Sequence, residues 1–210
     1  MERGGFMNIE KWINRTYPVF EESSTLEDVF SVKALAGLTN IISVDKEGRL
    51  SGTARLDAID DFDLSRKLSE IVVEPVFYCR DSDFIEDAAL MLIESHDYVL
   101  PVVNDDFVVV GAIGVFEILE GLMEFTAMDR PGARISIILE DKPGALRDVV
   151  DFLAEREVNI LSIITSTAES KEFKRVVIRT DESDISLIAD ILGEKGISFE
   201  SISEEEGFSV

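Results

Sequence analysis

A polar turn in the last third of the chain, together with one residue beyond the next helix, could bind a small zwitterion. Asp141 and Gly144 lie between an apolar run and a helical pattern. Backbone amides at a helix start have no partner within the helix and attract anions, so the amides near Gly144, Ala145 and Leu146 suit a carboxylate. Gly144 lets a ligand approach the backbone closely. An ammonium group would find acceptors in Asp141 and in the side chain of Asn159, so this pattern predicts a site for a free amino acid.

A purely structural interpretation of the same turn stays open. Asp141 and Gly144 are common turn residues, and Asn159 can satisfy its own backbone where a helix gives way to a strand. From the residues alone, the ligand-binding and the structural interpretations fit the pattern equally well.

The sequence offers little for catalysis or metal binding. Cys79 is the one cysteine and His96 the one histidine, whereas a zinc site needs several thiolates or imidazoles at short spacing. The aspartates from residue 57 to residue 63 lack the glycine that a calcium-binding loop requires. No motif in the sequence combines a nucleophile, a base and a cofactor. We therefore expect a protein that binds no metal and catalyses no reaction.

The charge balance argues against two classes of partner. The chain has 43 acidic and 20 basic residues and a net charge of -23, which repels phosphate backbones and anionic membrane surfaces. The longest apolar stretch, residues 107–116, is half of the ~20 residues that a bilayer span requires. The start of the chain shows neither the basic nor the apolar region of a signal peptide. We therefore expect a cytoplasmic protein without nucleic-acid or membrane partners.

An internal repeat organises the first part of the chain. A constant offset of 59 residues (111 - 52) places Gly52 on Gly111, and apolar, polar and acidic positions agree along both copies. Each copy is predicted to contain an apolar strand, a helix, two strands joined by an acidic turn, and a closing helix. The copies are assigned to residues 8–66 and 67–126.

The C-terminal part of the chain, residues 134–203, has a different order of elements. The proline and glycine at residues 131–132 interrupt the preceding helical pattern. Apolar runs then alternate with helical stripes in the order βαββαβ, which predicts an α+β unit with both helices on one face of the sheet. Its strands are predicted at residues 135–139, 158–165, 173–180 and 197–202.

Three helix starts are predicted from capping residues. Ser24 with Glu27 and Asp83 with Glu86 fit the capping box, in which each side chain bonds the other residue's backbone amide. Ser183 is predicted to cap the last helix. We therefore expect these helices to begin directly after residues 24, 83 and 183.

The repeat and the C-terminal unit resemble two known kinds of module. The segments that close the repeats, residues 52–57 and 111–117, are similar to CBS domains, and residues 140–146 with 158–160 resemble the start of an ACT domain. A tandem CBS pair, or Bateman-type module, followed by a ferredoxin-like ACT domain resembles the acetoin utilisation protein B group. This resemblance implies a regulatory homodimer that binds small molecules.

The CBS resemblance implies an adenosine-type ligand between the repeats, its ribose held by an aspartate three residues after a serine or threonine. In the second repeat Gly114 and Glu117 occupy these positions, and a glutamate can still accept from two hydroxyls. Phe77, like Phe20, is a candidate to line the pocket of the base. Since no lysine lies near Glu117, adenosine or an S-adenosyl compound is expected to fit better than ATP.

The first repeat departs further from the CBS pattern. Arg55 replaces the hydroxyl residue and Ala58 replaces the acid, while Asp57 stands one place early. Asp57 is therefore kept as a candidate nucleotide-binding residue, although the first site is expected to be degenerate.

For the ACT unit, the resemblance implies that amino acids bind at the turn, usually across an interface between two ACT units, with Asp141 and Asn159 at contacting positions. The sequence thus predicts a non-catalytic sensor whose CBS pair, ACT domain or both bind an effector. No cofactor is expected beyond an adenosine-containing ligand. The expected partners are a second copy of the chain, a small-molecule effector and an unidentified protein. The alternative is a structural dimerisation or interaction module with vestigial ligand sites.

Overall fold

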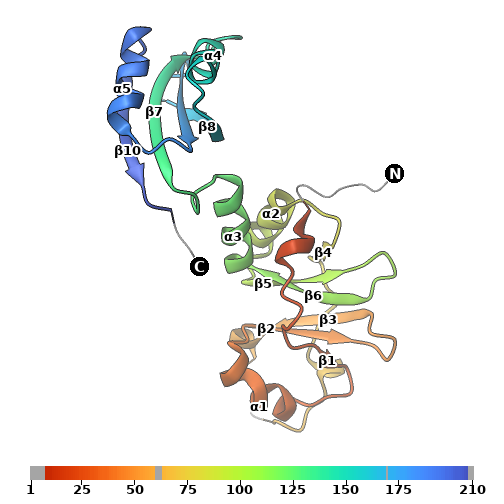
Figure 1. Cartoon of the computed structure of the whole chain (residues 1–210). Coiled ribbons are helices and arrows are strands. Elements are labelled where there is room, and N and C mark those ends of the chain that lie inside the picture. The colour runs from red at the N-terminus through yellow and green to blue at the C-terminus, as the bar shows by residue number, and fades with distance from the viewer. Residues whose placement is uncertain (1–7, 60–62, 169, 208–210) are drawn as a thin grey trace. The chain divides into compact units, whose positions relative to one another are not determined.

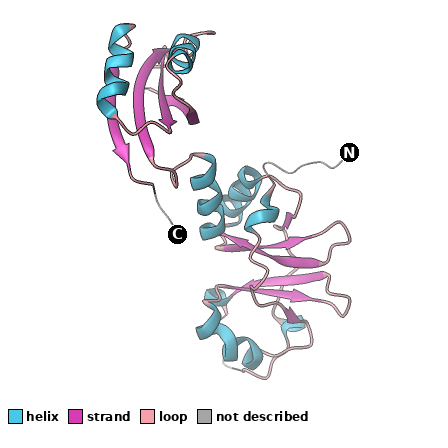
Figure 2. Ribbon diagram, viewed as in Figure 1, coloured by secondary structure: helices cyan, strands magenta, loops and turns pink. Residues whose placement is uncertain are grey.

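The fold of the chain is given by a computed structural model (Figure 1). It describes residues 8–59, 63–168 and 170–207. The chain divides into two compact units, Met1–Gly121 and Leu122–Val210. The first unit holds two three-stranded sheets and the second holds a four-stranded sheet (Figure 2). Each unit therefore has sheets of its own.

The two halves of the first unit have the same order of elements, displaced by 59 residues (85 - 26). In both sheets the short first strand pairs in parallel with the central strand, and the central strand pairs antiparallel with the third. The register even shifts at equivalent places, between Ser43 and Val44 and between Val102 and Val103. The duplication predicted from the sequence is therefore present in the backbone. The first copy contains η1 (Ile9–Trp12), β1 (Phe20–Glu21), α1 (Leu26–Ala36), β2 (Asn40–Val44) and β3 (Leu50–Arg55), and the second contains η3 (Leu68–Glu70), β4 (Cys79–Arg80), α2 (Ile85–Ser95), β5 (Val99–Val103) and β6 (Val109–Gly114).

A shared apolar core joins the two copies. The strands β3 and β6 lie side by side (Figure 1), and the Leu50 N–H at the start of β3 donates to the Phe107 carbonyl before β6 at 3.1 Å. Side chains from both sheets then pack into one cluster. Its buried members are Ile42, Leu50, Val103 and Ala112.

The two copies differ after their last strand. β6 leads directly into α3 (Val115–Phe125), whereas β3 leads into the short 3₁₀ helix η2 (Leu56–Ala58). The closing helix predicted for both copies is therefore found only in the second among the described residues. Residues 60–62 lie outside the described residues.

The first helix begins one residue later than predicted. Thr25, not Ser24, is the N-cap of α1: its hydroxyl accepts from the Asp28 N–H at 3.4 Å, and an Asp28 carboxylate oxygen accepts from the Thr25 N–H at 2.8 Å. A capping box is present, but it is formed by different residues. Ser24 and Thr25 can both cap a helix, but the Ser24 carbonyl accepts from the Leu68 N–H at 2.8 Å, while the Thr25 carbonyl accepts from the Val29 N–H at 3.4 Å, within the helix.

The other two predicted helix starts are also displaced by one residue. α2 has Phe84 at its N-cap with no side-chain cap, while Asp83 accepts from the Arg80 N–H at 2.7 Å in the preceding turn. α5 (Ile185–Glu194) has Asp184 rather than Ser183 at its N-cap, and one Asp184 carboxylate oxygen accepts from two amides of the first turn. The carboxylate satisfies two otherwise unpaired amides at once, which favours Asp184 as the cap.

The second unit is an antiparallel sheet with both helices on one face. The strand order is β10-β7-β9-β8, and every neighbouring pair is antiparallel. Ala133, Ile135 and Ile137 alternate along β7 and share one buried core with residues of both helices, including Phe152 and Ile188. This confirms the predicted ferredoxin-like βαββαβ arrangement. The elements are β7 (Gly132–Glu140), α4 (Arg147–Glu155), β8 (Ile160–Thr167), β9 (Phe173–Thr180), α5 and β10 (Phe199–Glu205).

The chain enters this sheet through a glycine that no other residue can replace without strain. Gly132 has φ 145°, and a Cβ atom there would lie 1.8 Å from the carbonyl oxygen of Thr180. That oxygen belongs to the backbone of the neighbouring strand β9, so it cannot move aside. Gly193, inside α5, has nothing within 4 Å of the same position.

We expect Gly132→Ala to lower the free energy of unfolding by more than about 1 kcal/mol, because both the backbone conformation and the contact with Thr180 oppose a side chain. The matched control, Gly193→Ala, removes a glycine from a helix and should leave stability unchanged or raise it by up to about 1 kcal/mol. Urea unfolding of both variants measures the difference. Equal losses in the two variants would contradict this account of the strand entry.

Candidate functional site

A cavity of about 360 Å³ lies between the two copies in the first unit. This volume falls in the range of small-molecule pockets. The walls come from the segment before β1, the segment after α1, the start of β5, the end of β6 and the first turn of α3. The lining residues are Asn14, Tyr17, Gly37, Thr39, Tyr98, Val99, Ala112, Gly114, Val115, Phe116 and Glu117.

Glu117 holds a fixed position in this cavity. It lies in the first turn of α3, where one carboxylate oxygen accepts from the Gly114 N–H at 2.9 Å and the other accepts from Asn14 Nδ2 at 3.2 Å. Asn14 is itself held, because its Oδ1 accepts from the amide of Thr16 at 3.1 Å and from the hydroxyl of Thr16 at 2.9 Å. A carboxylate has about four acceptor sites, so Glu117 keeps capacity for hydrogen bonds from a ligand.

Tyr17 is tied to the start of β2. Its hydroxyl donates to the Asn40 carbonyl at 2.7 Å and accepts from the Asn40 N–H at 3.2 Å. Burial raises the pKa of Tyr17 above its ordinary value, although the hydrogen bond to the Asn40 backbone opposes this rise. Asn40 is buried and also donates from Nδ2 to Asp97 at 2.9 Å, which joins the two copies. Hydrogen bonds between distant segments therefore hold this wall in place.

The electrostatics of the cavity disfavour phosphate. The described lining contains one carboxylate, that of Glu117, and neither lysine nor arginine. The chain as a whole carries a net charge of -23. A phosphate group would meet a negative field without a local cation, whereas a neutral or cationic ligand would not be repelled.

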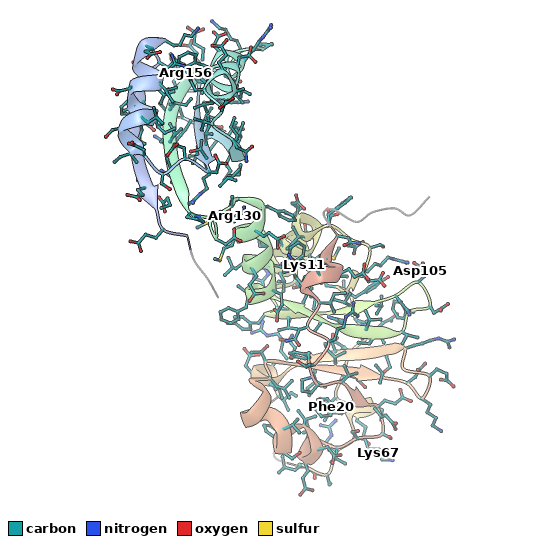
Figure 3. The ribbon with its side chains drawn as sticks, in the orientation of Figure 1. Lys11, Phe20, Lys67, Asp105, Arg130 and Arg156 are labelled. Carbon is teal, nitrogen blue, oxygen red and sulfur yellow. The ribbon has the colours of Figure 1, made fainter. Side chains whose placement is uncertain are left out.

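The structure brings together two of the four residues predicted to bind a nucleotide. Gly114 and Glu117 both line the cavity. Phe77 is half-buried but stands outside this lining, and Phe20 packs against the core cluster beneath α1 (Figure 3). Asp57 is exposed and also stands outside the lining. Asp57 follows β3 while Glu117 follows β6, so the two acids belong to equivalent but separate ends of the duplicated backbone.

Sequence reasoning missed five polar or aromatic residues of the lining, one of which is Phe116 beside Glu117. Thr39 and Tyr98 are related by the 59-residue offset (98 - 39), and both line the cavity. The repeat therefore contained a usable signal for these two residues, since each copy contributes the same position. Asn14 and Tyr17 precede the first strand, and no sequence pattern marks them.

The polar turn of the second unit is only partly as predicted. Among the described residues, no acceptor bonds the amides of Gly144 and Leu146, whereas the Ala145 N–H donates to the Lys142 carbonyl at 3.2 Å. The prediction that Ala145 offers an unpaired amide is therefore wrong, because the turn closes on itself through this bond. Gly144 has φ 86°, and a Cβ atom there would meet nothing within 4 Å. The backbone at Gly144 is thus open to a ligand.

Asp141 and Asn159 lie at opposite ends of the sheet within one chain. The residue before Asp141 pairs with Phe173 at the start of β9, and the residue after Asn159 pairs with Thr180 at the end of β9. The eight residues from Phe173 to Thr180, which are seven steps along the strand, span about 23 Å. The separation arises because β7 and β8 are parallel, so α4 must carry the chain back along the sheet between them. One chain alone does not bring these two predicted contacts together.

The described residues hold neither a metal-binding cluster nor a helix that could span a membrane. Within residues 8–59, 63–168 and 170–207, no group of three or more His, Cys, Asp or Glu side chains is arranged to hold a metal ion. None of the helices in these ranges is long and apolar enough to cross a bilayer. Cys79 is fully buried, and burial raises its pKa to about 12. Its thiol is therefore protonated at neutral pH and unsuited to nucleophilic attack.

The raised pKa of Tyr17 predicts how stability depends on alkaline pH. In the folded state Tyr17 stays protonated to a higher pH than in the unfolded state, so the stability this provides is present below the ordinary tyrosine pKa of about 10 and is lost as pH rises above it. Tyr17→Phe should reduce this alkaline loss and should cost about 1 kcal/mol at neutral pH through the missing hydrogen bond.

Urea unfolding of Tyr17→Phe and of the exposed control Tyr98→Phe, from neutral pH to above the tyrosine pKa, provides the measurement. The wild type and Tyr98→Phe should lose stability in parallel, and Tyr17→Phe should lose less. The same pH dependence in all three proteins would contradict the assigned burial of Tyr17.

Comparison with known proteins matches both units. The family model for the CBS domain matches residues 68–124, and that for the ACT domain matches residues 133–197. A CBS domain pair/ACT domain protein from Thermotoga maritima is 29% identical, with 56% of this chain and 98% of that chain covered and a TM-score of 0.52.

Two less similar structures show the fold alone. The CBS domains of a transcriptional regulator from Streptococcus pneumoniae are 15% identical, with 55% of this chain and 99% of that chain covered and a TM-score of 0.52. The CBS pair of a putative Mg²⁺ transporter from Shewanella oneidensis is 18% identical, with 59% and 74% covered and a TM-score of 0.53. With its duplicated first unit and its βαββαβ second unit, the chain is a CBS domain pair followed by an ACT domain.

Proposed function

We propose that this protein is a non-catalytic regulatory sensor that binds an adenosine-type ligand in the cavity between its CBS repeats. CBS and ACT domains are regulatory ligand-binding modules. The observation that carries the proposal is the Glu117 carboxylate, which Gly114 and Asn14 hold in place inside a cavity without a lysine or arginine in its described lining.

The chemistry of the lining suits a nucleoside. The vicinal hydroxyls of a ribose can donate to the free acceptor sites of Glu117. Val99, Ala112 and the ring of Tyr17 offer apolar surface for a base. Thr39 Oγ1 is buried without a hydrogen-bond partner among the described residues, so it can serve a polar atom of the ligand and remove the cost of an unsatisfied buried group.

The charge of the cavity supports adenosine or an S-adenosyl compound over ATP. Two like charges about 4 Å apart repel by about 4 kcal/mol at the effective dielectric constant near a protein surface. A phosphate close to Glu117 would meet this repulsion with no cation in the described lining to offset it. A sulfonium or amino group would instead be attracted.

The proposed mechanism is linkage between ligand and domain arrangement. A ligand in the cavity contacts Asn14 and Tyr17 from the first half of the unit and Glu117 from the second. Binding therefore stabilises the arrangement in which these groups converge. Coupling of this kind between two sites typically amounts to about 1–3 kcal/mol and acts equally in both directions.

Isothermal titration calorimetry with adenosine, S-adenosylmethionine, AMP and ATP tests the proposal. We expect adenosine and S-adenosylmethionine to bind, and ATP to bind at least about tenfold more weakly. Glu117→Ala should weaken adenosine binding at least about tenfold, since a hydrogen bond to a charged group contributes about 1.5–3 kcal/mol. The matched control, Glu120→Ala, changes an exposed acid on the same helix and should leave binding unchanged.

Two results would contradict the proposal in different ways. ATP binding more tightly than adenosine would overturn the electrostatic argument. Absence of binding by all four compounds would favour the alternative, a structural dimerisation or interaction module with vestigial sites.

The ACT turn supports a second binding function. We propose that an amino acid binds there between two copies of the chain, its carboxylate at the unpaired amides of Gly144 and Leu146. The Asp141 carboxylate pairs with Lys174 Nζ at 3.0 Å and can instead accept from the ammonium group of a bound amino acid. The exposed Asn159 lies at the far end of β9. Only a second chain can supply an Asn159 to the turn, so this site requires a homodimer with two equivalent sites.

Complementation between variants tests whether the amino-acid site is shared. Asp141→Ala and Asn159→Ala, each alone, should abolish binding of the amino acid found by titrating the wild type with the twenty common amino acids. After unfolding and refolding together, the mixed dimers should regain one site, because one of their two sites keeps both Asp141 and Asn159. Asp148→Ala, an exposed acid on α4, is the control that should bind normally.

Failure of the mixed dimers to bind would contradict a site shared between chains. A wild type that binds none of the twenty amino acids would assign the turn a purely structural role.

The location, the assembly and the closer family of the protein belong to the same proposal. We place it in the cytoplasm as a homodimer whose ligand-dependent arrangement is recognised by a partner protein. The order of two CBS repeats and one ACT domain supports membership of the acetoin utilisation protein B group.

A further inference from the structure

Two exposed aromatic side chains belong to the lining of the cavity that contains Glu117. Phe116 is 81% exposed and Tyr98 is 57% exposed, yet both line this cavity. Each ring therefore offers apolar surface to a molecule that enters the cavity. The function proposed above assigns no role to either ring.

The backbone places both residues at the same end of the hairpin formed by β5 and β6. The last paired residues at this end are Val99 and Gly114. One step beyond them, the Val115 N–H donates to the Tyr98 carbonyl at 3.3 Å. Phe116 follows in the first turn of α3, and side chains on a helix lean toward its N-terminus. The Phe116 ring therefore leans back toward the strand ends beside which Tyr98 stands.

Neither of these rings has an aromatic partner among the described residues. Tyr78 and Phe107 of the same unit differ in this respect, because their ring centroids lie 5.1 Å apart in an edge-to-face arrangement. Aromatic rings gain energy from stacking on another flat ring. The faces of Phe116 and Tyr98 are thus available for stacking on a flat ligand.

The fold does not require aromatic side chains at these two positions. The 59-residue offset relates Tyr98 to Thr39 and Phe116 to Asp57 (98 - 39 and 116 - 57). The first repeat forms the same strands with these polar side chains. The cavity of about 520 Å³ beside Arg55 has no aromatic residue in its described lining. The two rings are therefore a property of one cavity and not of the repeated backbone.

One ligand can reach both an aromatic ring and the carboxylate, because Phe116 and Glu117 are consecutive in the chain. The Glu117 carboxylate is held by the Gly114 N–H and by Asn14 Nδ2. A nucleoside has the two parts that match these neighbours, a planar base and a ribose with vicinal hydroxyls. Every base has a π-face, and its stacking on an aromatic side chain needs no hydrogen bond.

We propose that Phe116 and Tyr98 form an aromatic clamp that stacks on the base of the ligand, while Glu117 holds the ribose. The clamp makes a flat base the part of the ligand that the cavity selects. This inference rests on the function proposed for the cavity, but the base alone, without a ribose, tests the clamp separately.

Titration with adenine and with adenosine, followed by NMR, separates the clamp from the ribose site. Phe116→Ala and Tyr98→Ala should each weaken binding of both compounds by the same factor, at least about fivefold, because stacking on one ring is lost. Glu117→Ala should weaken adenosine but leave adenine unchanged, since adenine has no ribose. Phe116→Tyr keeps a ring at this position and should bind both compounds as the wild type does.

The matched control is Phe84→Ala, which removes another exposed phenylalanine of the same unit that lies outside the described lining. This variant should bind both compounds normally. A second readout is the position of the adenine H2 and H8 signals. Protons stacked over an aromatic ring are shielded, so these signals should move upfield on binding to the wild type and move less when Phe116→Ala is saturated.

Equal affinities of the wild type and Phe116→Ala for adenine would overturn the clamp, as would an equal loss in Phe84→Ala. Binding of adenine that depends on Phe116, without binding of adenosine, would support the clamp and overturn the function proposed for the cavity. Binding of neither compound to the wild type would overturn both.

Discussion

The apolar surface that the two CBS repeats bury against each other is the interaction on which the cavity depends. Ile42 and Leu50 of one repeat and Val103 and Ala112 of the other are at most 6% exposed. A single three-stranded sheet would leave these side chains in water, and burying one large aliphatic side chain contributes about 1.5–3 kcal/mol. Because this contact brings both repeats to one interface, Glu117 and Tyr17 can line the same cavity only when both repeats are folded.

The duplicated backbone has two equivalent strand ends, and the side chains at each end decide which groups line the cavity beside it. The strand bounds, the register shifts and the left-handed residue after each first helix are repeated. Gly114 ends one strand without a side chain, whereas Arg55 ends the other and donates to both carboxylate oxygens of Asp57. The same frame thus carries a cavity lined by Glu117 at one position and a cavity of about 520 Å³ lined by Arg55 and Ala58 at the other.

The ACT unit has a core of its own and a different structural constraint. Residues of α4 and α5 pack with the alternate residues of β7 on one face of the sheet. The crossover from β7 through α4 to β8 places Asp141 and Asn159 at opposite ends of β9. A site that uses both residues therefore depends on assembly, whereas the CBS cavity is complete within one chain.

The sequence by itself determined the elements and their repetition. It predicted residues 173–180 as a strand, which is where β9 lies, and it predicted the offset that the backbone of the CBS pair follows. Hydrophobic periodicity and turn residues suffice for this, because they act between near neighbours in the chain. The helix caps were wrong by one residue: adjacent residues such as Ser24 and Thr25 can both cap, and the tertiary bond from the Leu68 N–H to the Ser24 carbonyl leaves Thr25 as the cap.

Only the tertiary structure decided which side chains meet. Asn14 and Glu117 share a hydrogen bond although 103 residues separate them, and the Tyr17 hydroxyl bonds the backbone of Asn40, which is 23 residues away. Arg55 reaches the His96 carbonyl across the paired repeats. No local pattern encodes such contacts, because they arise when two independently patterned sheets bury a common surface and thereby place their strand ends together.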